Sequence, residues 1–188
     1  MTSISVQIPG YVSGKWDIDP AHTEIGFTAR HMMVSKVRGK FTNYTASLTT
    51  AENPLESHAE AEIDLSSITT GNDQRDDHLR SSDFFDIQTN PKMTFVSTGI
   101  RPSGGDFLVD GNLTIRGITK PITLTVEVGG FSADPYGGYR AGFSARGEIN
   151  RRDFGVNWNA AIEGGGVVVS DKVTIAVEVE AVLQKESA

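Results

Sequence analysis

The sequence of 188 residues contains no cysteine. Disulfide bonds, thiolate nucleophiles and cysteine-ligated metal sites are therefore excluded. No stretch approaches the roughly 20 apolar residues that span a bilayer as a helix. The N-terminus MTSISVQIPGYVSGKWDIDP has neither the basic start nor the long apolar run of a secretory signal peptide. We therefore expect a cytoplasmic protein without stable membrane insertion.

Positive charge is in the minority. Lysine and arginine together number 17 against 24 aspartates and glutamates, so the net charge is -7. Nucleic acids and anionic membranes are bound through a basic face. The overall balance therefore argues against both kinds of partner, although it leaves room for a local basic patch.

Catalytic and metal-binding motifs are also missing. The four histidines are neither clustered nor spaced as in HExxH, and Asp73, Asp76 and Asp77 lack the spacing of an EF-hand. The DFG at 153–155 has no kinase loops around it, and the GGG at 164–166 lacks the lysine and hydroxyl residue of a phosphate-binding loop. The sequence therefore predicts no enzyme, no metal site and no cofactor.

Most of the chain alternates apolar and polar residues with the period of two that is typical of half-buried strands. Between 23 and 31, for example, Ile25, Phe27, Ala29 and His31 share one face. Glycine, proline and asparagine turns separate such runs. About eight antiparallel strands are predicted, and the length of several favours a closed barrel. The runs are 23–31, 37–41, 59–65, 93–95, 106–116, 121–131, 139–145 and 172–183.

The apolar faces of these runs mix small and large side chains. Inward-pointing small residues leave either an open apolar cavity or room for the rings of a filled core, and the pattern alone leaves both alternatives open. The small residues are Gly39, Ala59, Ala61, Gly111, Ala141, Ala145 and Gly147.

The alternation stops at TGNDQRDDHLRSSDFFD, residues 70–86. Asn72 or Asp73 can cap a short helix here, and Arg80 lies late in it, as the helix dipole favours. Phe84 and Phe85 would anchor the end of the segment on the barrel. A short helical segment is therefore predicted near 72–85.

The charged groups of this segment have a structural interpretation. We expect Arg75 to form an ion pair with Asp76 or Asp77. His22 is expected to bond to backbone in a turn, and His31 to be a hydrogen-bonded core residue.

Several motifs, taken in order, resemble one known family. They are WDIDPAHT at 16–23, FTARHMM at 27–33, VRGKF at 37–41, RDDHL at 75–79, DFF at 83–85, GNLTIRGITKP at 111–121 and RDFG at 152–155. This order resembles the YceI-like family of lipocalin-like polyisoprenoid-binding proteins, and the resemblance covers roughly 15–184.

The resemblance implies an eight-stranded antiparallel lipocalin-like β-barrel over 15–184. The ends of the chain, 1–14 and 185–188, show no strand pattern and are expected to be flexible tails. The resemblance implies an apolar pore that holds a polyisoprenoid lipid, an isoprenoid quinone or another long aliphatic amphiphile, for transport or storage without catalysis. It also implies a homodimer, and a helical segment at 70–86 that closes part of the barrel.

Residue type and motif membership then predict the ligand contacts. The pore-lining residues are expected to be Phe27, Ala29, Phe41, Phe84, Phe85, Phe95, Phe107, Phe143, Phe154 and Trp158. The head-group residues are expected to be His31, Arg38, Arg75, His78 and Arg152, although the alternation places Arg38 on the outer face.

Two other functions stay open at this point. The first is an enzyme acting on such a lipid, with His31 or His78 as the acid–base group and Asp76 nearby. The second is a structural or stress-related dimer whose core is simply filled.

Overall fold

The computed structural model describes residues 6–32, 34–160 and 168–185. The strands within these ranges form one antiparallel sheet. They are β1 (Gly14–Ile18), β2 (Glu24–His31), β3 (Ser35–Phe41), β4 (Tyr44–Thr50), β5 (His58–Asp64), β6 (Ile68–Thr69), β7 (Lys92–Ser103), β8 (Asp106–Ile115), β9 (Ile118–Ala133), β10 (Tyr139–Asn150) and β11 (Val169–Leu183). The α-helix is α1 (Asp73–Arg80), and the 3₁₀ turns are η1 (Pro20–His22), η2 (Pro54–Glu56), η3 (Leu65–Ser67) and η4 (Arg151–Phe154).

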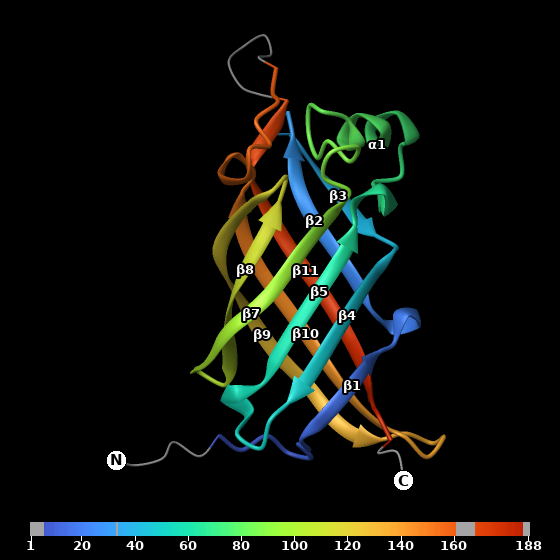
Figure 1. The fold of residues 1–188 in the computed structure, drawn as a ribbon, viewed down its shortest axis with the longest axis vertical. Helices are drawn as coiled ribbons and strands as arrows, with labels where there is room; N and C mark the ends of the chain where they lie inside the picture. The colour runs from blue at the N-terminus through green and yellow to red at the C-terminus, as the bar shows by residue number, and fades with distance from the viewer. Residues whose placement is uncertain (1–5, 33, 161–167, 186–188) are drawn as a thin grey trace.

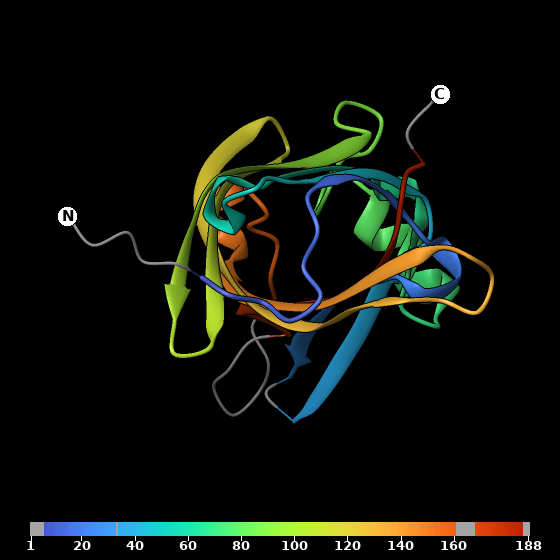
Figure 2. The same cartoon turned by 90° about the horizontal axis from the view of Figure 1, so that it is seen from below.

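The sheet closes on itself because β11 pairs with β10 on one side and with both β1 and β2 on the other. β1 and β2 follow each other along β11, separated by η1. β3 and β4 follow each other in the same way and act as one bent strand, and so do β5 and β6. The closed sheet therefore counts as eight strands, which confirms the predicted eight-stranded antiparallel barrel (Figures 1 and 2).

Three strands, β1, β4 and β6, are not among the predicted runs, and β6 has only two residues. β4 has the sequence YTASLTT, in which Tyr44, Ala46 and Leu48 face inward and Thr45, Ser47 and Thr49 are exposed. Threonine, serine and alanine differ little in polarity, so the alternation is faint. β1 has only five residues, with Trp16 as its buried side chain.

Two clusters of buried side chains close the ends of the barrel. One lies at the α1 end and includes Phe41, Ile68, Phe84 and Phe154. The other lies at the opposite end of the barrel, beside β1, and is built on Trp16, Phe131, Ala141 and Ala181, which are joined by the partly buried Ile8, Tyr11 and Val12. Residues 8–14 thus contribute packed side chains as well as the start of β1 at Gly14.

The predicted helix is confirmed, with Asn72 as its N-cap accepting a hydrogen bond from the Arg75 backbone N–H. The predicted ion pair of Arg75 is wrong. Arg75 donates to the backbone oxygen and hydroxyl of Thr70, and the Asp76 carboxylate accepts from the N–H and hydroxyl of the same residue. Asp76 is only 3% exposed, and it is Arg80 that pairs with Asp77, at 3.0 Å.

No helix among the described residues is both long and apolar enough to cross a membrane.

Candidate binding cavity

A cavity of about 380 Å³ lies inside the barrel, between the two clusters of buried side chains. This volume is within the range of small-molecule sites, which are commonly about 300–1,000 Å³. Inward-facing residues of the long strands line it, such as Ile25 on β2, Val109 on β8, Val126 on β9 and Ile175 on β11. The interior is therefore open, and its wall is almost wholly apolar.

Glycines in the wall keep the middle of the barrel open. Phe27 is the cross-strand partner of Gly39, and its ring lies over that glycine: a Cβ atom at position 39 would be 2.3 Å from the ring Cζ. Phe95 lies over Gly111 in the same way, also at 2.3 Å. The rings thus lie against the wall instead of crossing the interior, which resolves the choice between an open and a filled core.

The α1 end of the cavity is covered by the segment that follows the helix. Phe84 and Phe85 both line the cavity, and Phe84 is buried. Arg116 holds this segment by donating to the backbone oxygen of Phe84, at 2.5 Å. Arg80 fixes the helix on the barrel with bonds to the backbone oxygens of Ser66 and Ile68. The segment therefore forms a lid anchored by arginines.

The opposite end is crossed by the N-terminal segment, drawn in blue in Figure 2. Ile8 and Tyr11 line the cavity there. The Tyr11 hydroxyl donates to the backbone oxygen of Ala51, and the Tyr139 hydroxyl donates to that of Gly10. These bonds tie residues 8–11 across the mouth.

Arg151 is a cationic side chain in the cavity wall and is only 4% exposed. Its guanidinium donates to the backbone oxygens of Ser170, Val156, Trp158 and Val169. Burial lowers its pKa. With its donors bound to carbonyls, Arg151 holds η4 and β11 together rather than offering a charge to a ligand.

The predicted pore-lining residues lie around the cavity with one exception. Those in the wall are Phe27, Ala29, Phe41, Phe84, Phe85, Phe95, Phe107, Phe143 and Phe154. Trp158 packs outside the wall, with its ring 4.6 Å from that of His78 and 5.4 Å from that of Phe84.

The predicted head-group residues lie outside the described cavity wall. His31 ends β2, and Arg38 is exposed on the outer face of β3. His78 Nε2 lies 2.8 Å from Asp83 Oδ2, and Arg152 Nε donates to Asp171 Oδ1 at 2.7 Å.

Arg75 is bound to Thr70, and so is Asp76, the candidate partner of a catalytic histidine. The structure thus places these predicted residues about the α1 end without gathering them into one cluster among the described residues.

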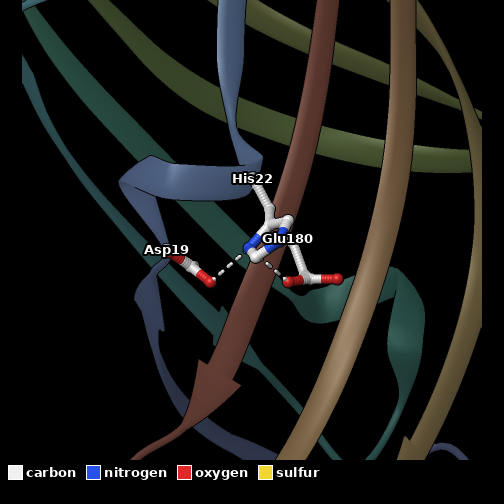
Figure 3. Close-up of side chains that lie close together, drawn as sticks. All are labelled: Asp19, His22 and Glu180. Atoms are coloured by element: carbon white, nitrogen blue, oxygen red, sulfur yellow. Dashed lines mark hydrogen bonds and ion pairs between the residues drawn. The ribbon is translucent and has the colours of Figure 1, made fainter.

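A polar cluster lies on the outside of the barrel, where η1 meets β11 (Figure 3). His22 Nδ1 lies 2.8 Å from Asp19 Oδ2 and 3.2 Å from Glu180 Oε2. The expectation that His22 bonds to backbone is therefore wrong, because its ring faces carboxylates. Arg140 Nη1 donates to the same two carboxylates, at 2.9 and 2.8 Å.

These contacts change the protonation of the cluster. The hydrogen bond from His22, together with that from Arg140, lowers the pKa of Asp19 to about 2. The bond to Asp19 raises the pKa of His22. Asp19, His22 and Glu180 have ligand atoms close enough to suit a metal ion. The Arg140 guanidinium already bridges the two carboxylates, so the cluster is a structural clamp.

The fold and the cavity have counterparts among known proteins. The model of the YceI-like domain matches residues 16–181. The chain belongs to the YceI-like family. A UPF0312 protein of Staphylococcus epidermidis is 42% identical over 168 residues, which is 88% of this chain and 96% of that protein.

Two solved structures are also similar to this YceI-like chain. BcnA of Burkholderia cenocepacia has a TM-score of 0.76 and 26% identity, covering 87% of this chain and 99% of that one. A domain of Saccharophagus degradans, described as polyisoprenoid binding and implicated in plant cell wall breakdown, has a TM-score of 0.62 and 17% identity, with 92% and 100% covered. At that identity the second likeness concerns the fold alone.

Proposed function

We propose that this YceI-like protein binds a long aliphatic lipid, a polyisoprenoid or an isoprenoid quinone, inside the barrel and acts as its carrier or store. The observation that supports this most is the apolar cavity of about 380 Å³ with covered ends. The description of the Saccharophagus degradans domain as polyisoprenoid binding points to the same class of ligand.

The energetics of an apolar wall suit such a ligand. Each buried CH₂ group contributes about 0.8 kcal/mol, so ten groups contribute about 8 kcal/mol before the cost of association is subtracted. Affinity then depends on chain burial and shape, and few polar contacts are needed.

The polar side chains along the cavity are engaged within the protein. Ser97 Oγ accepts the backbone N–H of Ala59, and Thr50 Oγ1 accepts from Trp16 Nε1 at 2.8 Å while donating to the backbone oxygen of Val12. The Arg151 guanidinium is bound to backbone carbonyls. His58 and Glu60 also line the cavity, but they pair with each other at 2.9 Å and their side chains are 47% and 55% exposed. Acid–base catalysis needs a titratable group within reach of the ligand, and we propose that this solvent-exposed pair takes no part in catalysis, so that the role is binding alone.

The polar end of the lipid is proposed to lie at the α1 end, where the predicted head-group residues are found. His78 is the best placed of them, because its ring is 5.0 Å from that of Phe84, which lines the cavity. The expected homodimer remains part of the proposal, and light scattering on purified protein measures it.

Native mass spectrometry of protein purified from its own host, followed by organic extraction, tests the proposal. We expect a bound mass that is released as a prenyl lipid, a quinone or a related amphiphile. Protein that carries no extractable lipid and also ignores added prenyl probes would contradict it. Turnover of the bound lipid would favour an enzyme instead.

A further inference from the structure

The hairpin of β2 and β3 ends in exposed apolar side chains. It reaches the end of the barrel at which α1 lies (Figure 1). Met32 is 41% exposed and Val34 is 85% exposed, so both present apolar surface at the tip. Clustered apolar residues on a surface, rimmed by polar ones, mark interaction sites.

The charge on this hairpin is opposite in sign to that of the whole protein. From 25 to 51 the sequence has no aspartate or glutamate, although the net charge is -7. Arg30, Lys36 and Arg38 lie on the exposed outer face behind the tip, and Arg30 is the direct cross-strand partner of Lys36. Like charges in such a pair repel each other. Within the described part of the chain, none of these three side chains forms an ion pair.

Stability does not explain the residues of the turn. Met32 has φ of 53°, in the left-handed region that disfavours a side chain. Asparagine and glycine adopt this conformation with less strain and are the usual hairpin residues. A strained backbone conformation that is retained at an exposed methionine points to a functional role for the methionine side chain.

We propose that the tip residues Met32 and Val34, with Arg30, Lys36 and Arg38 behind them, dock this barrel on an anionic lipid bilayer. The apolar tip would enter the head-group layer, and the cations would lie at the level of the lipid phosphates. Charge complementarity therefore identifies the partner as a negatively charged membrane surface.

Protection of a strand edge and binding of nucleic acid each fit this surface less well. Charged residues on an edge strand discourage pairing with other chains, but Arg30 lies on β2, which is paired on both sides. Nucleic acids are bound by cations with aromatic or polar contacts to bases, whereas this patch has aliphatic side chains at its centre.

The site also lies where a lipid carrier would need it. Phe27 and Ala29, on the same β2 strand, line the cavity. Docking by the hairpin would bring the α1 end of the barrel to the membrane. The inference itself depends on the surface and not on the proposed ligand, so the two are tested separately.

Cosedimentation with lipid vesicles tests the docking site. The full chain is mixed with vesicles of phosphatidylcholine, with and without phosphatidylserine. We expect binding to the anionic vesicles that weakens with salt. Each basic residue near such a surface is worth about fivefold in affinity, so R30Q, K36Q and R38Q together should weaken binding by about a hundredfold or more. Val34→Ser should also weaken it.

The matched control carries K15Q, R146Q and K185Q. It loses the same three positive charges as the hairpin variant, but at exposed positions outside the hairpin. It should bind the anionic vesicles nearly as well as the unaltered protein. Equal losses in the two triple variants, no binding to anionic vesicles, or a preference for nucleic acid over vesicles would each overturn the proposal. Prenyl-probe binding, measured without vesicles, should be unchanged in the control variant and in a variant that carries R30Q and K36Q without R38Q, and it reports separately on the cavity.

Discussion

Replacing Gly39 with alanine should narrow the cavity while the barrel stays folded. The new Cβ would lie 2.3 Å from Cζ and 2.6 Å from Cε1 of Phe27. Apolar carbons pack at about 3.5–4.0 Å, so the ring has to move by about 1 Å or more. The wall lies behind the ring and open volume lies in front of it, so the ring should move into the cavity.

The effect on folding should be small because two contributions oppose each other. Alanine restricts the unfolded chain and stabilises by about 0.4–1 kcal/mol. Moving Phe27 weakens its tilted contact with Phe41, at 5.7 Å between centroids, and such contacts contribute about 0.5–1.5 kcal/mol. The free energy of unfolding should therefore change by no more than about 1 kcal/mol.

The effect on binding should be larger. If the displaced ring excludes two or three CH₂ groups of the ligand, about 2 kcal/mol of burial is lost, which is roughly a thirtyfold weaker affinity. Titration of delipidated protein with a fluorescent long-chain prenyl probe measures this, and urea unfolding measures the stability.

Two further variants make the test specific. Gly99→Ala is the control, because a Cβ there would meet nothing within 4 Å, and it should bind the probe normally. Phe27→Leu combined with Gly39→Ala removes the clashing ring and should restore most of the affinity. If Gly39→Ala binds the probe as tightly as the unaltered protein, the reasoning about the cavity is refuted.

Three other predictions concern the clamp, the wall and the ends of the barrel. The pKa of Asp19 is lowered from 3.8 to about 2, so the ionised carboxylate stabilises the folded protein fully above pH 4, and this stabilisation is lost as the pH falls through 2. Asp19→Asn should therefore flatten the plot of unfolding free energy against pH between pH 4 and 2. An unchanged plot would contradict this prediction. Arg151→Met leaves buried carbonyls without donors and should destabilise by about 3 kcal/mol or more in urea unfolding, whereas a neutral result would show that water replaces the guanidinium. Phe84→Ala and Tyr11→Ala open opposite ends, so the one that speeds probe release in stopped-flow measurements identifies the exit, and unchanged release in both would contradict the assignment of these residues as covers.

The barrel is largely predictable from the sequence because the residues of its long strands alternate clearly between two faces. In β11 the alternation of Val173, Ile175, Val177 and Val179 with polar residues leaves little choice of structure. The helix is also predictable, since Asn72 is a good N-cap. β4 gives no comparable signal because its alternating residues are alike in polarity.

The site is less predictable because it depends on register and turn geometry. That Phe27 lies over Gly39 follows from the pairing of β2 with β3, which alternation alone does not fix. The RDFG motif suggests Arg152 as a ligand contact. The 3₁₀ turn η4 instead directs the adjacent Arg151 inward. The packing of Tyr11 against the barrel end is not predictable from the sequence, because an irregular segment gives no periodic signal for the end that it covers.

The position of a bound lipid tests the proposed function most directly. A crystal structure of the protein loaded with a brominated long-chain prenyl lipid would locate the bromine atoms by their anomalous signal. We predict that the chain lies inside the barrel, between Phe84 at one end and Tyr11 at the other. Bromine found only on the outer surface, with the interior unchanged, would contradict binding inside the barrel.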